Sequence, residues 1–196
     1  MRVSTFSTIV ADPDWQYDNF GAAKHGAARS HYPGSPLEEM SRIPVAEWAR
    51  KDSILFLWAT WPKLDQAIDV MRSWDFRLVT GAPWVKTTPK AGDIRRGIGF
   101  WWQSVSELLL VGRRGAAKAP TQKDKQLALL VEDRQFYAPR GPHSRKPPSL
   151  VEWIESNFPG PYLELYARQN RPGWECWGHE TGWHLCPEGV KRLESV

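Results

Sequence analysis

Three short runs of mainly apolar or β-branched residues constrain the fold of this chain most: Phe6–Ala11, Ser53–Trp58 and Val105–Val111. Each run is shorter than a typical helix, and a continuous apolar run is typical of a strand that is covered on both faces. Two further strands are predicted at Phe76–Lys86 and Tyr162–Ala167. The chain is therefore built around a buried sheet.

Helical patterns lie between these strands. Pro62 opens a predicted helix over Lys63–Trp74, in which apolar residues recur at helical spacing. A short helix is predicted around Pro44–Arg50, and the Pro147–Pro148 pair opens another through about Phe158. Strands that alternate with helices predict an α/β fold with a mostly parallel sheet and helices on both faces.

Three stretches do not fit this pattern. Residues 16–36 are polar and non-periodic, and Thr87–Trp102 is a second long loop. Gly81–Pro83 is expected to interrupt the strand at Phe76–Lys86, and residues 116–145 show only a short strand near Leu127–Val131. Long loops in compact domains are usually functional, so both loops are expected to serve a site.

Composition limits the class of protein to which this chain can belong. The 196 residues suit a single domain, 1–196, and the net charge of +4 permits a nucleic-acid partner without requiring one. Two cysteines do not make a disulfide framework, and no apolar stretch resembles a membrane span or a leader. A cytoplasmic protein without a membrane partner is expected. Twelve tryptophans indicate stacking surfaces as well as core.

The first strand ends in Asp12-Pro13-Asp14-Trp15. The exocyclic amine of adenine is a poor nucleophile because its lone pair is delocalised into the ring. A carboxylate and an aimed carbonyl can accept hydrogen bonds from that amine, and an adjacent aromatic ring can stack on the base. Asp12, the Pro13 carbonyl and Trp15 supply these parts. The alternative is an Asp-Pro turn with Trp15 in the core.

Polar residues follow other strands too. In parallel sheets ligands bind beyond the carboxyl ends of the strands, so four such ends are expected to meet in one crevice. They are Asp12–Trp15, Trp58–Trp61, Trp84–Lys86 and Arg168–Asn170. Glu107 stands inside an apolar run and needs a partner if it is buried.

Longer blocks carry a family resemblance, which runs from Ile9 to Glu180. The blocks are "HYPGSPLEEM" at 31–40, "LFLWAT" at 55–60, "WVK" at 84–86, "SELLLVGRRG" at 106–115 and a C-terminal block at 143–180. Together with the Asp-Pro-Asp-Trp motif they resemble the MT-A70 family of adenine-N6 methyltransferases, and its bacterial and phage members most. The resemblance implies a Rossmann-like fold that uses S-adenosylmethionine, with the catalytic motif placed before the cofactor-binding strand.

The resemblance also implies residue roles. Asp12, Pro13, Asp14 and Trp15 form the catalytic motif, and Lys146 pairs with the methionyl carboxylate of the cofactor. Residues implied at the base pocket are Tyr32, Trp58, Trp84, Lys86 and Glu107. Residues implied along the cofactor are Glu164, Leu165, Tyr166, Arg168, Asn170, His179 and Glu180. The substrate is adenine in nucleic acid, with DNA favoured over RNA, and a dimer or partner subunit is possible.

Two departures from the family pattern leave alternatives open. Asp14 replaces the second proline of the motif, and a carboxylate beside Asp12 either raises the pKa of both acids or points to water. A weak or inactive nucleic-acid-binding homologue is therefore an alternative, as is methylation of another amine. His179 replaces an asparagine, and together with Cys176, His184 and Cys186 it offers enough ligands for a zinc site, although no metal is expected.

Overall fold

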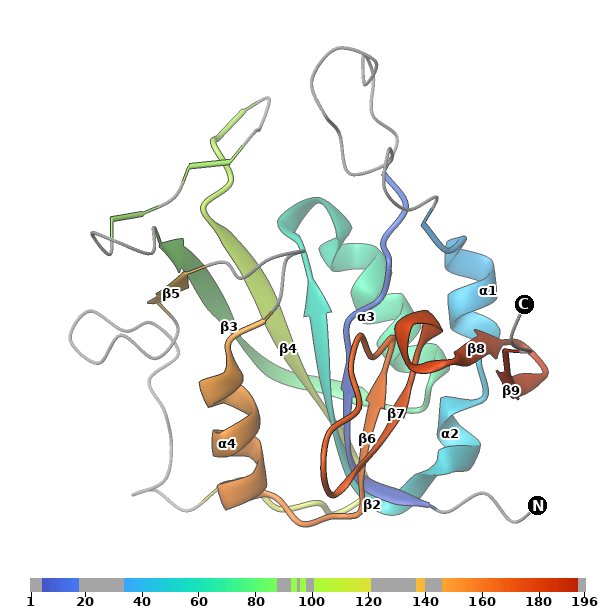
Figure 1. Ribbon diagram of the computed structural model, residues 1–196. Helices are drawn as coiled ribbons and strands as arrows, with labels where there is room; N and C mark the ends of the chain where they lie inside the picture. Colours follow the sequence, from blue (N-terminus) through green and yellow to red (C-terminus); the bar gives the residue numbers. More distant parts are fainter. Residues whose placement is uncertain are drawn as a thin grey trace.

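The computed structural model describes residues 5–17, 34–87, 93–94, 96–97, 101–120, 137–139 and 146–193. Its centre is a seven-stranded sheet with the strand order β5-β3-β4-β2-β1-β6-β7 (Figure 1). The strands are β1 (Phe6–Ala11), β2 (Ala49–Ala59), β3 (Arg77–Thr87), β4 (Ser106–Arg114), β5 (Tyr137–Pro139), β6 (Tyr162–Leu165) and β7 (Trp174–Trp177). Among these strands only β4 is antiparallel to its neighbours. The predicted mostly parallel α/β sheet is confirmed.

Helices cover both faces of the sheet, as predicted (Figure 1). They are α1 (Leu37–Arg42), α2 (Val45–Trp48), α3 (Leu64–Ser73) and α4 (Pro148–Asn157). The first three pack their buried side chains with Ile9, Leu55 and Leu57 of the sheet. In contrast, α4 packs against Val10 and Phe56, which point to the opposite face because side chains alternate along a strand.

The sequence placed α3 and α4 correctly, because prolines mark both beginnings. Pro62 lies in a 3₁₀ turn, Trp61–Lys63, that leads into α3, and Pro148 is the first residue of α4. The predicted helix at 44–50 is shorter than expected. It ends at Trp48, where β2 begins at once, and the separate helix α1 precedes it.

The predicted interruption of β3 is wrong. The strand runs without a break through Gly81–Pro83, and its register shifts only between Leu78 and Thr80. In the described part of the chain, β3 has β4 on one side here and meets β5 only from Val85 onward. Proline is tolerated on such an edge because its missing N–H leaves no sheet hydrogen bond unmade.

The C-terminal region contains structure that the periodicity did not predict. β7 extends the sheet beyond β6, and it is followed by the 3₁₀ turn His179–Thr181 and a hairpin of β8 (Trp183–Cys186) and β9 (Gly189–Arg192). The strand predicted near Leu127–Val131 lies outside the described residues. No helix in the described part is long and apolar enough to cross a membrane.

The carboxyl ends of four strands meet at one edge of the sheet. β1, β2, β3 and β6 all finish at this edge, because they run in the same direction. β4 begins there, since it is antiparallel, so Glu107 joins this edge from the start of its strand. β2 and β6 lie on opposite sides of β1. The crevice where the order of strands reverses is the usual ligand site of an α/β sheet.

Candidate active site

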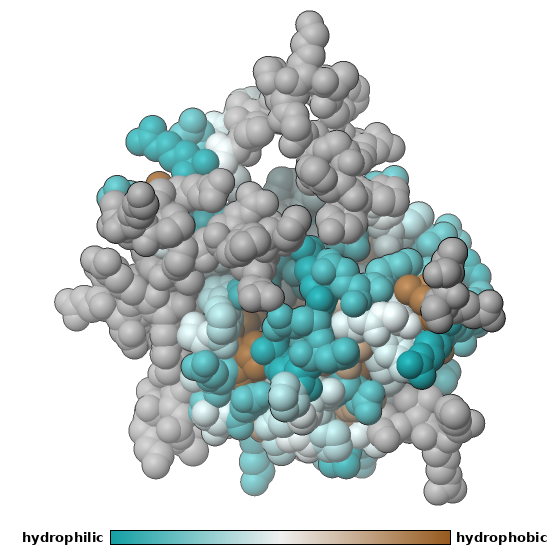
Figure 2. Space-filling view, viewed as in Figure 1, coloured by the Kyte–Doolittle hydropathy of each residue, from teal (hydrophilic) through white to brown (hydrophobic). Residues whose placement is uncertain are grey.

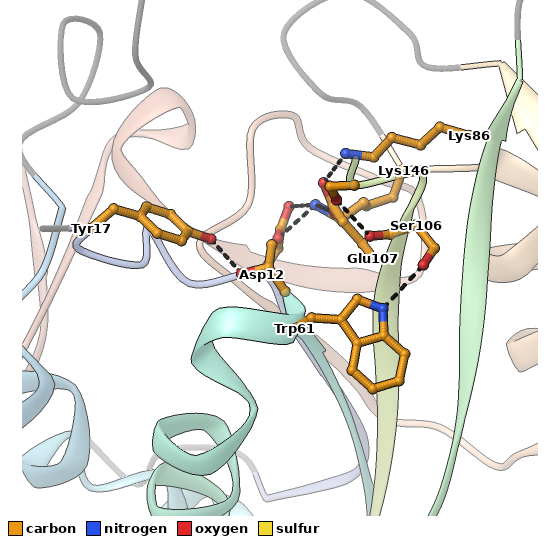
Figure 3. Close-up of polar contacts among 9 residues, drawn as sticks. Asp12, Tyr17, Trp61, Lys86, Ser106, Glu107 and Lys146 are labelled. Carbon is orange, nitrogen blue, oxygen red and sulfur yellow. Dashed lines mark hydrogen bonds and ion pairs between the residues drawn. The ribbon is translucent and has the colours of Figure 1, made fainter. Parts of the chain in front are cut away.

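Four charged side chains form a continuous series of ion pairs at this edge: Lys86, Glu107, Lys146 and Asp12 (Figure 3). Lys86 Nζ donates to Glu107 Oε1 at 2.5 Å, and Lys146 Nζ lies 3.2 Å from Glu107 Oε2. Lys146 Nζ also donates to both carboxylate oxygens of Asp12 at 2.7 Å. Because the charges alternate, each half-buried group has an opposite charge beside it, which offsets the loss of hydration.

The pKa values follow from this arrangement. Burial alone would raise the pKa of Glu107, but Lys146 and Lys86 outweigh burial and hold that pKa below its ordinary value. Burial alone would lower the pKa of Lys146, but Asp12 and Glu107 raise it instead. Glu107 is therefore a carboxylate and Lys146 an ammonium at neutral pH. Lys146 links the end of β1 to the start of β4 by charge.

Two buried tryptophans contact the ammonium groups of this network. Trp58 and Trp84 are 2% and 0% exposed, and their rings meet edge to face with centroids 5.8 Å apart. Lys146 Nζ lies 5.2 Å from the ring centroid of Trp58, and Lys86 Nζ lies 5.6 Å from that of Trp84. Each indole thus supports one ammonium through a cation–π contact. Both rings are almost fully covered in this structure, and the lining of a base pocket by Trp58 and Trp84 stays a prediction.

Trp15 also has a different position from the predicted one. It is 8% exposed, packs in the hydrophobic core and donates its indole N–H to the carbonyl of Trp58 at 3.0 Å. This bond ties the segment after β1 to the end of β2. The core alternative therefore describes Trp15 better than stacking on a base, because most of the ring surface is already covered.

Asp14 does not point into water. Its side chain is largely covered, and burial raises the pKa of its carboxyl above the ordinary value of 3.8, with the nearby Asp12 adding to the rise and Arg168 and His179 opposing it. The backbone of this turn is fixed: the Asp14 carbonyl accepts the Ser35 N–H at 2.9 Å. Asp14 therefore does not follow the alternative in which it points into water, and its role in the catalytic motif stays a prediction.

The substitution Asp14→Asn is expected to raise the melting temperature at pH 7. A carboxyl whose folded pKa is raised destabilises the native state as the pH rises through that pKa, and this cost is absent below the unfolded value of 3.8. The gain should shrink steadily as the pH falls toward that value. Thermal unfolding at several pH values measures it, with the exposed Glu39→Gln variant as control. An equal gain at every pH would contradict this electrostatic origin.

The residues predicted on the cofactor side of β6 differ in their burial and in their partners. Glu164 pairs with Arg171 at 3.3 Å, and burial raises its pKa although Arg171 partly offsets the rise. The Leu165 side chain is fully buried, and its carbonyl accepts the Asp12 N–H at 3.4 Å, so its place along the cofactor-side strand stays a prediction. Tyr166 has a φ of +61°, which is uncommon for a bulky residue.

Beyond β6 the predicted residues lie in more open positions. The Arg168 guanidinium reaches Glu180 at 4.0 Å, while Asn170, His179 and Glu180 are exposed. The Tyr166 hydroxyl is buried and has no hydrogen-bond partner among the described residues, and burial together with the Asp14 charge raises its pKa. An unpaired buried hydroxyl is costly, so this position suits a bound polar ligand.

The proposed zinc ligands do not converge. His179 Nε2 and His184 Nδ1 lie 3.2 Å apart, but Cys176 and Cys186 are buried free thiols. No group of three metal-binding side chains occurs among the described residues, which include all four of these. The two histidines form a surface pair instead.

Two neighbours of the network, Tyr17 and Ser106, were not predicted from the sequence (Figure 3). Tyr17 bonds Thr60 Oγ1 through its hydroxyl at 2.6 Å, and Trp61 donates its indole N–H to Ser106 Oγ at 3.2 Å. The aromatic residue Tyr17 in the segment after β1 was the available signal, whereas Thr60 and Trp61 lie in the predicted strand end Trp58–Trp61. Tyr32, which the resemblance placed at the base pocket, lies outside the described residues.

A cavity of about 900 Å³ lies at the opposite edge of the sheet, away from this network. It is lined by Lys51, Ile68, Arg72, Asp75, Phe76, Arg77, Leu78, Arg113, Arg114 and Gly115. None of the residues predicted for catalysis or cofactor binding lines it. The candidate site is therefore identified by the series of charged side chains and not by this cavity.

Comparison with known proteins places this geometry in a family. The type II methyltransferase M.MunI of a Mycoplasma species is 30% identical over 193 residues, which cover 89% of this chain and 77% of that protein. The human N(6)-adenine-specific methyltransferase METTL4 is 30% identical over 186 residues, covering 90% of this chain and 38% of METTL4. The catalytic subunit METTL3 of the human N(6)-adenosine-methyltransferase is 29% identical, with 96% and 31% covered.

The chain thus spans most of M.MunI but only about a third of the two human relatives. The family model for MT-A70 matches residues 6–180, from the first residue of β1 to the turn after β7. The matched segment contains Asp12, Glu107, Lys146 and every cofactor-side position discussed above. This chain belongs to the MT-A70 family.

Proposed function

We propose that this protein transfers a methyl group from S-adenosylmethionine to the N6 amine of adenine in nucleic acid. The observation that carries the proposal is the Asp12 carboxylate, held by Lys146 at the carboxyl end of the interior strand β1. Relatives that share this segment, METTL4 and METTL3, are named as methyltransferases of adenine and adenosine N6.

The acceptors at the end of β1 suit an amine with two N–H donors. An ionised carboxylate has about four lone-pair sites, so Asp12 keeps capacity after accepting two bonds from Lys146. The Pro13 carbonyl accepts the Trp15 N–H at 3.0 Å and keeps a second lone pair. Together they would draw electron density onto the amine nitrogen and orient it. Catalysis is then chiefly positioning and stabilisation of the nitrogen as it becomes cationic; its extra proton leaves to solvent.

The residues present fit the cofactor. The unpaired Tyr166 hydroxyl and the half-buried pair of Glu164 and Arg171 lie where β6 leaves the sheet. Gly178 packs its backbone so close to Ala167 that a Cβ would collide with it, which holds the turn after β7 against the end of β6. When bound, S-adenosylmethionine supplies the methyl group from its sulfonium. Glu164, Tyr166, Arg168, Asn170, His179 and Glu180 would hold it, and Lys146 would meet its carboxylate.

The substitution Arg168→Ala is expected to weaken S-adenosylmethionine binding about tenfold. A hydrogen bond that involves a charged group contributes roughly 1.5–3 kcal/mol, and Arg168 is partly exposed, which favours the lower end of that range. Isothermal titration gives the dissociation constant. The matched control is Arg192→Ala, a surface arginine on β9 outside the family match. Equal affinity in the wild type and the Arg168→Ala variant would remove this residue from the cofactor site.

Product identification tests the proposed function directly. The wild-type protein is incubated with S-adenosylmethionine that carries a deuterated methyl group, and with unmodified DNA and RNA in separate tubes. Digestion to nucleosides and mass spectrometry should then show the label on N6 of adenine. Label on cytosine, or on a small molecule or protein amine instead, would contradict the proposal. The two tubes decide between DNA, which we favour, and RNA.

One observation favours a second candidate function, a nucleic-acid-binding homologue with little or no activity. The Asp14 carboxyl is half-buried, and burial together with the nearby Asp12 raises its pKa, so a second acid stands in the motif where the family has a proline. Cofactor binding without transfer would favour this reading. A dimer or partner subunit and a cytoplasmic location belong to the proposal as well; the free thiols of Cys176 and Cys186 are consistent with a reducing compartment.

A further inference from the structure

Two neighbouring tryptophans are almost fully exposed. Trp101 and Trp102 are 94% and 87% exposed, whereas Trp58, Trp74 and Trp84 have almost no exposed surface. Figure 2 shows a described surface that is mainly hydrophilic, with small and separate hydrophobic patches. Large exposed aromatic surface is unfavourable in water, and it commonly marks an interaction site. The position of this pair therefore requires a functional explanation.

The loop that carries the pair is anchored directly beside the ion-pair network. Its base is closed by Gly97 N–H to the Ser104 carbonyl at 2.7 Å, and by Lys86 N–H to the Val105 carbonyl at 2.8 Å. A Cβ at Gly97 would collide with the Ser104 carbonyl, so glycine is needed for this closure. Residues 101–105, which carry the pair, continue beyond the start of β4 (Figure 1). The same anchored unit thus presents both the tryptophans and the charged residues.

The distance along the chain limits how far the pair can lie from the site. Trp102 is five residues before Glu107, and five fully extended residues span at most about 18 Å. Successive nucleotides in one strand of a duplex rise about 3.4 Å each, so this reach corresponds to a few nucleotides. Arg96 is exposed in the same loop and offers a cation for a phosphate.

We propose that Trp101 and Trp102 form a stacking platform for unstacked bases that lie a few nucleotides from the target adenine. This inference rests on the proposed function and names how that site holds its nucleic acid. Every base has a flat π face, so indoles bind bases without sequence preference. A base taken out of a duplex, or a single strand, exposes such faces, and the platform would compensate for the stacking that is lost.

Binding of single-stranded oligonucleotides of random sequence tests the platform. Fluorescence anisotropy compares the wild type with variants that carry both Trp101→Ala and Trp102→Ala, both changes to Phe, or both changes to Leu. The exposed Leu193→Ala variant is the matched control for loss of surface apolar area. S-adenosylmethionine affinity and sedimentation are recorded for every variant, because they report an intact site and the oligomeric state.

The alanine variant is expected to lose roughly 5- to 100-fold in affinity for both DNA and RNA strands. Phenylalanine should restore most of the affinity, and leucine, which is apolar without a π face, should not. Wild-type affinity in the alanine variant, full rescue by leucine, or a change from oligomer to monomer would overturn the platform; the last would assign the pair to a protein interface.

Methyl transfer separates this inference from the proposed function. If the wild type binds strands through the pair but labels no adenine, the proposed function fails and the platform stands. If the wild type labels adenine and the alanine variant binds and labels equally well, the platform fails and the proposed function stands.

Discussion

Replacement of Lys146 by methionine is expected to reduce methyl transfer at least a hundredfold and to lower the free energy of unfolding by about 3 kcal/mol. Lys146 Nζ lies between Asp12 and Glu107, and the three side chains are 17%, 26% and 12% exposed. Without the ammonium, two carboxylates face each other at the edge of the sheet. Glu107 keeps Lys86 as a partner, so the loss lies at the lower end of the range for a broken buried pair.

The destabilisation should depend on pH in a defined direction. The pKa of Glu107 is lowered by its lysines, so its contribution to stability is present above the unfolded value of 4.5 and is lost as the pH falls through the folded value. The pKa of Lys146 is raised, so its contribution is present below 10.5 and is lost at higher pH. Urea unfolding at pH 7 and pH 4 should therefore show a smaller difference between variant and wild type at pH 4.

Two further variants separate charge from packing. Lys146→Arg keeps the charge and should retain most of the stability, but it changes the geometry at Asp12 and should remain slow in transfer. The double variant with Asp12→Asn and Lys146→Met removes one charge of each sign and should recover part of the stability without recovering activity. Equal stability of Lys146→Met and the wild type would show that the ion-pair series contributes nothing to folding.

The second large effect is expected from Asp12→Asn. The amide is nearly the same size as the carboxylate, but it presents only one acceptor oxygen and carries no charge. Loss of one such electrostatic contact in other active sites lowers the rate 10²- to 10³-fold, and a similar loss of single-turnover methyl transfer is expected here. S-adenosylmethionine affinity should change by much less, because Lys146 keeps Glu107 as a partner.

Asp12→Glu is the matched control, since it keeps the charge and moves it by one methylene. A misplacement of about 1 Å can cost 10²-fold in rate, so this variant should also be slow while its unfolding free energy stays close to that of the wild type. Wild-type transfer rates in both Asp12 variants would show that this carboxylate does not hold the acceptor amine.

The sequence predicted much of the fold because the informative residues act locally. Short, mainly apolar or β-branched runs such as Phe6–Ala11 predict buried strands. Pro62 and Pro148 mark the beginnings of helices, because the fixed φ of proline suits the first turn. β7 and the hairpin of β8 and β9 were missed because their short segments, rich in tryptophan, glycine and histidine, carry no clear period. The uninterrupted course of β3 depends on its edge position, which only the tertiary structure defines.

The candidate site was predicted in its members but not in its contacts. Strand ends and the family resemblance brought Asp12, Lys86, Glu107 and Lys146 together, whereas the bonds from Lys146 to both Asp12 oxygens could not be read from residue types. The roles of the tryptophans depend on how far each ring is buried. The sequence alone cannot show that Trp15 is covered by its neighbours. Residue type likewise does not reveal the orphan hydroxyl of Tyr166, which depends on what packs around it.

The most direct test of the central claim is transfer of a radiolabelled methyl group from S-adenosylmethionine to nucleic acid, measured beside an Asp12→Ala variant. A parallel substrate has every adenine replaced by purine, which lacks the 6-amino group. We predict label in the adenine-containing strands with the wild type alone, and none in the purine strands. Equal labelling by the Asp12→Ala variant, or labelling of the purine strands, would contradict the assignment of Asp12 as the group that holds the adenine amine.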